Sequence, residues 1–104
     1  MAQIVWAESA LQELDDIAEY ISLDKPFAAT RFVKTVFEKV DRLALFPDSG
    51  RRIPEVPLSI YREIIVKPCR LIYRVEEEKV LIVHVYRNEQ HVQAYLLEQI
   101  EEVE

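Results

Sequence analysis

Arginine is the residue type in this chain whose number and spacing could do chemistry. Four arginines lie among runs of β-branched and aromatic residues in the second half of the sequence: Arg62, Arg70, Arg74 and Arg87. A guanidinium group holds a carboxylate or a phosphate through two parallel hydrogen bonds. Together with Lys67, these arginines are expected to form a partner-binding basic patch. The alternative for each is an ordinary solvated arginine, alone or paired with Glu63 across the strands.

RNA cleavage is the reaction that such a patch could support. An RNase that directs a ribose 2′-OH at the adjacent phosphate needs a general base, a general acid and cations. The candidate acid or base is His84, and the candidate cations are Arg70 and Arg87. His84 is flanked by two valines in a strand-like run, which favours a half-buried, hydrogen-bonded histidine over a catalytic one. No cluster of His, Cys, Asp or Glu has the spacing of a metal site, so we expect neither metal nor cofactor.

The overall composition limits the possible ligands and the cellular setting. The chain has 104 residues, which predicts one domain over 1–104. Its formal net charge of −6 argues against free RNA or DNA as the main ligand, and its single glycine excludes a glycine-rich phosphate loop. We see no signal peptide and no apolar run long enough to span a bilayer, and there is one cysteine. These features predict a cytoplasmic protein that is not bound to a membrane.

Three consecutive strands are predicted to hold the arginines. The runs cover 61–66, 70–75 and 80–86 and are rich in β-branched and aromatic residues. Their short connections can join only antiparallel neighbours, so we expect a three-stranded antiparallel meander. By alternation, Leu71, Tyr73 and Val75 face the core, whereas Arg70, Ile72 and Arg74 lie on a partly solvated face. The third strand is apolar on both faces and is expected to be the most buried.

Two helices are predicted before these strands, after a short strand over Gln3–Trp6. A capping box of Ser9 and Gln12 starts a first helix that runs from about Glu8 to about Ser22. An Asp24 N-cap followed by Pro26 starts a second helix, which extends to about Phe46. The short linker makes the two an antiparallel hairpin, with apolar stripes that need the sheet as a partner. Acidic residues Glu13, Asp15, Asp16 and Glu19 are expected on the solvated side of the first helix.

The remaining segments are predicted as a turn, a connection and a tail. Gly50 is expected to take a positive φ in the turn after the second helix. The segment Arg52–Ser59 contains two prolines and is expected to be an extended connection. Asn88 can cap a C-terminal helix over 88–104. The fold class is therefore α+β, in the order β-α-α-β-β-β with a C-terminal helix.

Several short stretches in this order resemble the ParE branch of the RelE/ParE superfamily, the toxins of type II toxin–antitoxin modules. The stretches are Ala10-Leu11-Gln12-Glu13-Leu14, Pro26 with Ala28-Ala29, Phe46-Pro47-Asp48-Ser49-Gly50-Arg51, Tyr61-Arg62-Glu63, Arg70-Leu71-Ile72-Tyr73-Arg74-Val75 and the strand from Val80 to Arg87. The resemblance implies a toxin of the plasmid-stabilization type that inhibits DNA gyrase and is neutralised by a co-encoded antitoxin. It also implies a homo-dimer or a hetero-oligomer with that antitoxin, whose tail lies over the hairpin and the sheet.

Two alternatives remain within this resemblance. RelE-like relatives are ribosome-dependent mRNA endonucleases, and Arg70 matches the arginine that opens the corresponding strand. The His-Tyr pair of some nuclease relatives is absent here, where the sequence reads Tyr86-Arg87-Asn88-Glu89, and no lysine cluster replaces it. The protein is therefore expected to be an inhibitor rather than an enzyme. The second alternative is a non-toxic member that still binds an antitoxin.

Overall fold

A computed structural model of the chain describes residues 1–88. The elements are β1 (Gln3–Trp6), α1 (Glu8–Ser22), α2 (Pro26–Asp41), a 3-10 turn η1 (Arg42–Ala44), β2 (Arg51–Arg52), β3 (Arg62–Val66), β4 (Cys69–Glu76) and β5 (Lys79–Arg87). This order confirms the predicted α+β class. The predicted C-terminal helix falls, apart from Asn88, outside the described residues.

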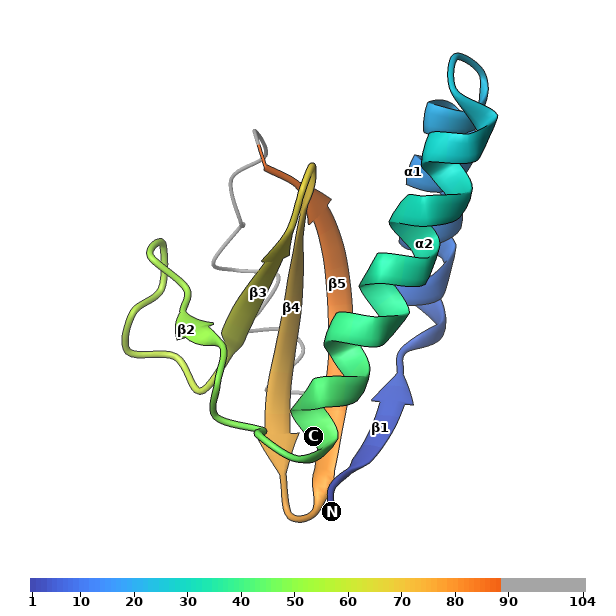
Figure 1. Cartoon of the computed structure of the whole chain (residues 1–104). Coiled ribbons are helices and arrows are strands. Elements are labelled where there is room, and N and C mark those ends of the chain that lie inside the picture. Colours follow the sequence, from blue (N-terminus) through green and yellow to red (C-terminus); the bar gives the residue numbers. More distant parts are fainter. Residues whose placement is uncertain (89–104) are drawn as a thin grey trace.

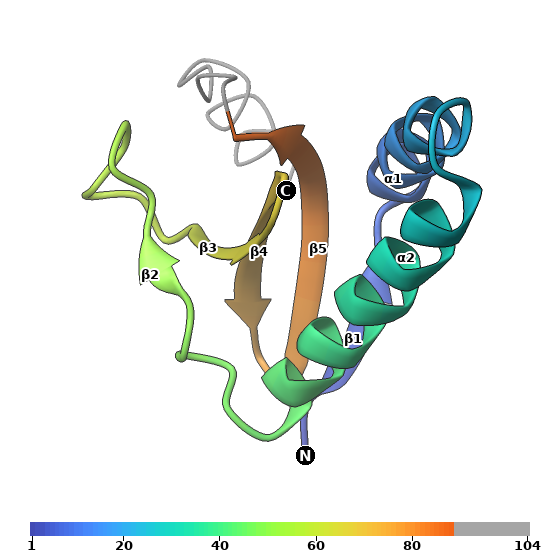
Figure 2. The same cartoon turned by 45° about the horizontal axis from the view of Figure 1, so that its top comes forward.

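The strands form one five-stranded sheet in the order β1-β5-β4-β3-β2. Strands β3, β4 and β5 make the predicted antiparallel meander, and β1 adds to β5 in parallel. The two-residue β2 pairs with the start of β3 at the other edge. The register of β4 and β5 shifts between Ile72 and Tyr73. The hairpin of α1 and α2 covers one face of this sheet (Figures 1 and 2).

Both helix starts differ from the predicted caps. The N-cap of α1 is Ala7, and its N–H donates to Ile82 O at 2.9 Å, which fixes the chain where β1 ends. The helix therefore begins at Glu8, and Ser9 lies inside its first turn. The N-cap of α2 is Lys25, because a residue that precedes proline avoids the helical conformation. Neither helix has a side-chain cap, so the predicted roles of Ser9 and Asp24 were wrong.

The main core lies between the hairpin and the sheet. The largest fully buried side chains on this side of the sheet are each less than 2 % exposed. They are Tyr73, Leu43, Leu71, Ile82, Val36, Val40 and Val80. The predicted inward direction of Tyr73 is confirmed. Trp6 packs its ring against Phe37 with a centroid separation of 5.2 Å, and this contact joins β1 to the hairpin. Cys69 is the first residue of β4 and is fully buried.

A second, smaller core covers the other face of the sheet. It consists of Ile53, Tyr61, Ile72 and Val83, with Val56, Leu81 and Tyr86 around them. The connection between β2 and β3 folds over this face through two turns, in which Val56 N–H donates to Ile53 O and Ser59 N–H donates to Val56 O. The prediction of a partly solvated face was therefore wrong for β4. This central strand, rather than β5, has the more continuously buried residues.

Gly50 is required by a close approach rather than by a positive φ. Among the described residues no glycine has a positive φ, so that expectation was wrong. The Gly50 N–H donates to the Tyr73 hydroxyl at 2.9 Å, and the hydroxyl donates to Pro47 O at 2.7 Å. A Cβ at position 50 would lie 2.5 Å from the Tyr73 Oη, which leaves no room for a larger residue.

The buried hydroxyl of Tyr73 predicts a pH-dependent stability. Burial raises the pKa of Tyr73 above its ordinary value of 10.0, since ionisation would place a charge in the core. The neutral phenol thus stabilises the fold fully below about pH 10, and this contribution falls as pH rises through the higher folded pKa. Tyr73→Phe is expected to cost about 1–3 kcal/mol at pH 8, because Gly50 N–H loses its acceptor.

Urea unfolding of both proteins at pH 8 and near pH 10.5 checks this expectation. The stability difference between wild type and Tyr73→Phe should shrink at the higher pH, because only the wild type has the titrating group. A difference that is constant across this range would contradict it.

Candidate functional site

Arg70 is the centre of a buried ion-pair network. Its Nη1 and Nη2 donate to the two carboxylate oxygens of Glu55 at 2.7 and 2.8 Å, and its Nε donates to Glu63 Oε1 at 2.9 Å. The side chains of Arg70 and Glu63 are 7 % and 0 % exposed. The hydrogen bonds to Glu55 are the largest cause that raises the pKa of Arg70 above its ordinary value. The group is therefore a permanent cation held by two carboxylates.

Glu63 extends this network to the edge of the sheet. Its Oε2 accepts hydrogen bonds from Arg51, whose Nη2 lies at 2.6 Å and whose side chain is 60 % exposed. The pair of Glu63 with Arg70 agrees with the alternative of an arginine that is paired across the strands. Glu55 lies in the connection over the second core, and no pattern in the sequence predicts its place beside Arg70. The network therefore joins β2, β3, β4 and this connection.

Arg74 and Arg62 are also engaged by neighbouring groups. Arg74 is 2 % exposed and donates to the Tyr61 hydroxyl at 3.1 Å and to Glu76 Oε2 at 3.0 Å. Its guanidinium carbon lies 5.9 Å from the centroid of the Tyr61 ring. Arg62 donates to Gly50 O at 2.9 Å from a partly buried position.

The four arginines do not form one exposed patch. Arg70 and Arg74 are buried, whereas Arg87 is exposed at the end of β5. Arg87 lines a hollow of about 330 Å³ between α1 and β5, together with Glu13, Ile17, Tyr20, Tyr86 and their neighbours. Partner binding by these arginines stays a prediction, and the arginines it would present are Arg87 and the partly exposed Arg62.

His84 faces α1 and is partly buried. Its Nδ1 lies 3.4 Å from Glu13 Oε1, its side chain is 15 % exposed, and its ring stacks on Tyr86 with centroids 5.1 Å apart. The same Glu13 oxygen accepts the Val85 N–H at 3.1 Å. The geometry is that of a half-buried histidine beside a hydrogen-bonding carboxylate. Glu13, expected on the solvated side of α1, is instead turned towards β5.

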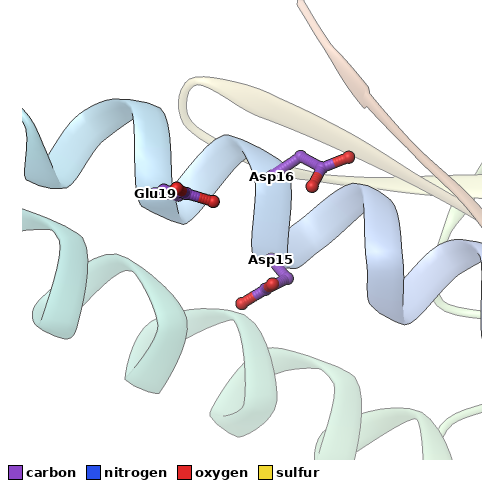
Figure 3. A group of neighbouring side chains, drawn as sticks. All are labelled: Asp15, Asp16 and Glu19. Atoms are coloured by element: carbon purple, nitrogen blue, oxygen red, sulfur yellow. The ribbon is translucent and has the colours of Figure 1, made fainter.

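The other acidic residues of α1 are exposed, as predicted. Asp15, Asp16 and Glu19 come from neighbouring positions on this helix (Figure 3). Each offers a carboxylate oxygen, and these oxygens lie within 4.8 Å of one another. Exposed acidic groups commonly gather in this way without an ion, so the cluster by itself defines no metal site.

Exposed apolar side chains are the surface feature that the helical periodicity did not predict. Tyr20, Leu23 and Phe27 gather around the α1–α2 connection with exposed fractions of 70, 81 and 84 %. Leu45 and Phe46 follow η1, and Leu58 and Ile60 lie in the connection before β3. Large apolar side chains that remain exposed together are typical of surfaces that bind other proteins. No helix described within residues 1–88 meets the length and apolarity that a membrane crossing requires.

A helical hairpin on one face of a mostly antiparallel sheet, with exposed apolar side chains and internally paired arginines, defines the class of a small α+β domain. The family model described as "ParE toxin of type II toxin-antitoxin system, parDE" matches residues 4–92, and the chain belongs to this family. The protein is thus a toxin of a type II toxin–antitoxin system, and membership of this family implies an antitoxin partner. The resemblance seen in the sequence is confirmed.

Known relatives agree with this family. Toxin RelE2 of Caulobacter vibrioides is 36 % identical over 86 residues, which is 82 % of this chain and 93 % of the relative. A structure described as "Chromosomal ParDE TA system from P. aeruginosa" matches with a TM-score of 0.71 and 24 % identity, covering 84 % of this chain and 96 % of that one. The "YoeB/ParE toxin from Agrobacterium tumefaciens" matches with a TM-score of 0.54 and 14 % identity, covering 82 and 96 %. These two structures support the fold alone.

Proposed function

We propose that this toxin acts by binding DNA gyrase and inhibiting it, and that it cleaves no RNA. The observation that carries the proposal is the burial of Arg70 between Glu55 and Glu63. In a nuclease of this superfamily this arginine would stabilise the charged phosphate of the transition state. Here its donors are occupied by carboxylates, which would also repel a phosphate that approached it.

The other candidate catalytic groups do not compensate for the unavailability of Arg70 to a phosphate. Arg74 lies under Tyr61, and His84 is next to Glu13 on the side of α1. A general acid or base must come within hydrogen-bond reach of the proton that it transfers. A half-buried His84 is poorly placed to reach a ribose, so binding rather than catalysis accounts best for the site.

The antitoxin is proposed to cover the exposed apolar surface of the hairpin. The hollow between α1 and β5 combines apolar Ile17 and Tyr20 with charged Asp16 and Arg87, which suits an amphipathic partner segment. We expect a hetero-oligomer in which this surface is buried. Its formation would stabilise the toxin by mass action, because the antitoxin binds the folded toxin.

Induction of the toxin alone in bacteria tests the proposed target. We expect DNA synthesis, followed by labelled-precursor uptake, to stop before protein synthesis and to be accompanied by an SOS response. Purified toxin should then inhibit supercoiling by purified gyrase, and co-expression of the antitoxin should abolish both effects.

The nuclease alternative predicts a different outcome in the same experiment. Translation would collapse first, messages would be cut, and Arg87→Ala, which changes an exposed residue, would abolish the cutting. Unimpaired growth with soluble toxin present would identify the non-toxic alternative. Either result would overturn the gyrase proposal.

A further inference from the structure

Strand β3 has an open edge along its second half. Its partner β2 pairs only with Arg62 and Glu63. The next three residues, Ile64–Val66, pair with β4 on one side and, within residues 1–88, with no strand on the other. An open edge offers backbone N–H and C=O groups to which an extended segment can add.

Hollows follow this open edge. Two of them, of about 350 and 530 Å³, lie between α2 and β3 and share Lys39 and Ile65. A third, of about 370 Å³, also includes Ile65 and is bordered by Asn88. We call the three together the β3-edge groove. Its apolar floor is Ile64, Ile65 and Val66.

The β3-edge groove is basic although the protein is acidic. Five exposed cations line it: Arg31, Lys39, Arg42, Arg51 and Lys67. The carboxylates in its lining are Glu55 and Glu63, and both are already bound to Arg70. Among the described residues, an ion pair is formed by Arg51 but not by the other four cations. The groove therefore suits an extended segment that carries several carboxylates and a few apolar side chains.

The C-terminal sequence of this chain has that composition. Residues 89–104 hold five glutamates and no lysine or arginine. Four of the glutamates fall in the last seven residues, Glu98-Gln99-Ile100-Glu101-Glu102-Val103-Glu104, which also contain two β-branched apolar residues. The chain enters this segment beside the groove, because Asn88 N–H donates to Pro68 O in the β3–β4 turn at 2.7 Å.

We propose that residues 98–104 bind in the β3-edge groove of their own chain, with glutamates on the exposed cations and Ile100 or Val103 against Ile65. The nine residues 89–97 can span at most about 30 Å when extended, and about 14 Å when helical. The segment starts at the groove itself, because Asn88 borders it. The bound tail would cover the open edge of β3 and compete with any acidic partner strand. The proposal does not depend on the target of the toxin.

A spin label on the full-length chain tests this contact. Glu101→Cys carries the nitroxide, and Cys69 is fully buried and so protected from labelling. At low salt we expect loss of the NMR amide signals of Ile64–Lys67 and of Lys39. At about 1 M salt the signals should return, because the Debye length falls to about 3 Å.

Charge variants of the labelled protein provide the controls. Lys39→Glu with Arg42→Glu should restore the amide signals of Ile64–Lys67 at low salt, whereas Lys34→Glu, an exposed change on α2 outside the groove, should leave them lost. Signal loss elsewhere in the molecule, or none, would overturn the proposal. So would loss that grows with protein concentration, since that would place the tail of a second copy in the groove.

Discussion

Replacing Glu63 by leucine is expected to lower the free energy of unfolding by about 3–5 kcal/mol, the cost of breaking a buried ion pair on one side. The Glu63 side chain has 0 % exposure and accepts hydrogen bonds from both Arg70 and Arg51. Without it, the buried Arg70 cation keeps Glu55 alone as a charged partner among these contacts. Such a loss is a large part of the roughly 5–15 kcal/mol that stabilises a typical domain.

A double variant separates the lost pair from the lost side chain. Glu63→Leu combined with Arg70→Met should recover part of the stability, because it removes the buried cation and leaves apolar groups of similar volume. The carboxylate of Glu55, whose side chain is 22 % exposed, loses Arg70 as a partner in the same variant. Urea unfolding followed by circular dichroism gives the three values, and exposed Glu78→Gln is the control, expected within about 0.5 kcal/mol of wild type. A loss below about 1 kcal/mol for Glu63→Leu would show that water solvates Arg70.

Local periodicity accounts for the parts of the fold that could be predicted. The helical stripe of α1 and the runs of β3, β4 and β5 placed these elements to within a residue or two. Short connections required antiparallel neighbours, which the sheet order confirms. The place of β1 beside β5 could not be predicted, because a parallel partner is chosen across a crossover of more than 70 residues.

The site was harder to predict because its partners come from a segment without periodicity. The connection before β3 contains two prolines and alternates in no regular way, yet it supplies Ile53 to the second core and Glu55 to Arg70. Alternation placed Arg70 and Arg74 correctly on one face of β4. It could not show that this face is covered, since only the tertiary position of the connection decides that.

The helix starts show a similar competition between local and tertiary signals. Ser9 and Asp24 are good capping residues, but the hydrogen bond from Ala7 to β5 and the restriction on the residue before Pro26 set both starts. Position 50 needs glycine for its lack of a Cβ rather than for a positive φ, because the Tyr73 side chain occupies that space. In each case the deciding contact joins residues that are distant in the sequence or depends on the adjacent backbone.

Tyr61→Ala is expected to cost about 3–5 kcal/mol, the usual range for removing a large buried aromatic side chain. Tyr61 is fully buried in the second core, where Ile72 and Val83 supply the sheet side. Its hydroxyl also accepts the hydrogen bond from Arg74, and its ring lies over that guanidinium. The variant therefore opens a cavity and removes a partner from a buried cation.

The same contacts of the second core also predict a local effect of the Tyr61→Ala change. The connection between β2 and β3 is held to the sheet by Ile53 and Tyr61, so Tyr61→Ala should release it and make it sensitive to proteolysis, while the main core under the hairpin persists. Tyr61→Phe should lose only about 1 kcal/mol, the share of the hydroxyl. Leu58→Ala in the same connection, where the side chain is 97 % exposed, should behave as wild type. Equal proteolysis of the Tyr61→Ala and Leu58→Ala proteins would mean that Glu55 and Arg70, rather than the second core, hold this connection in place.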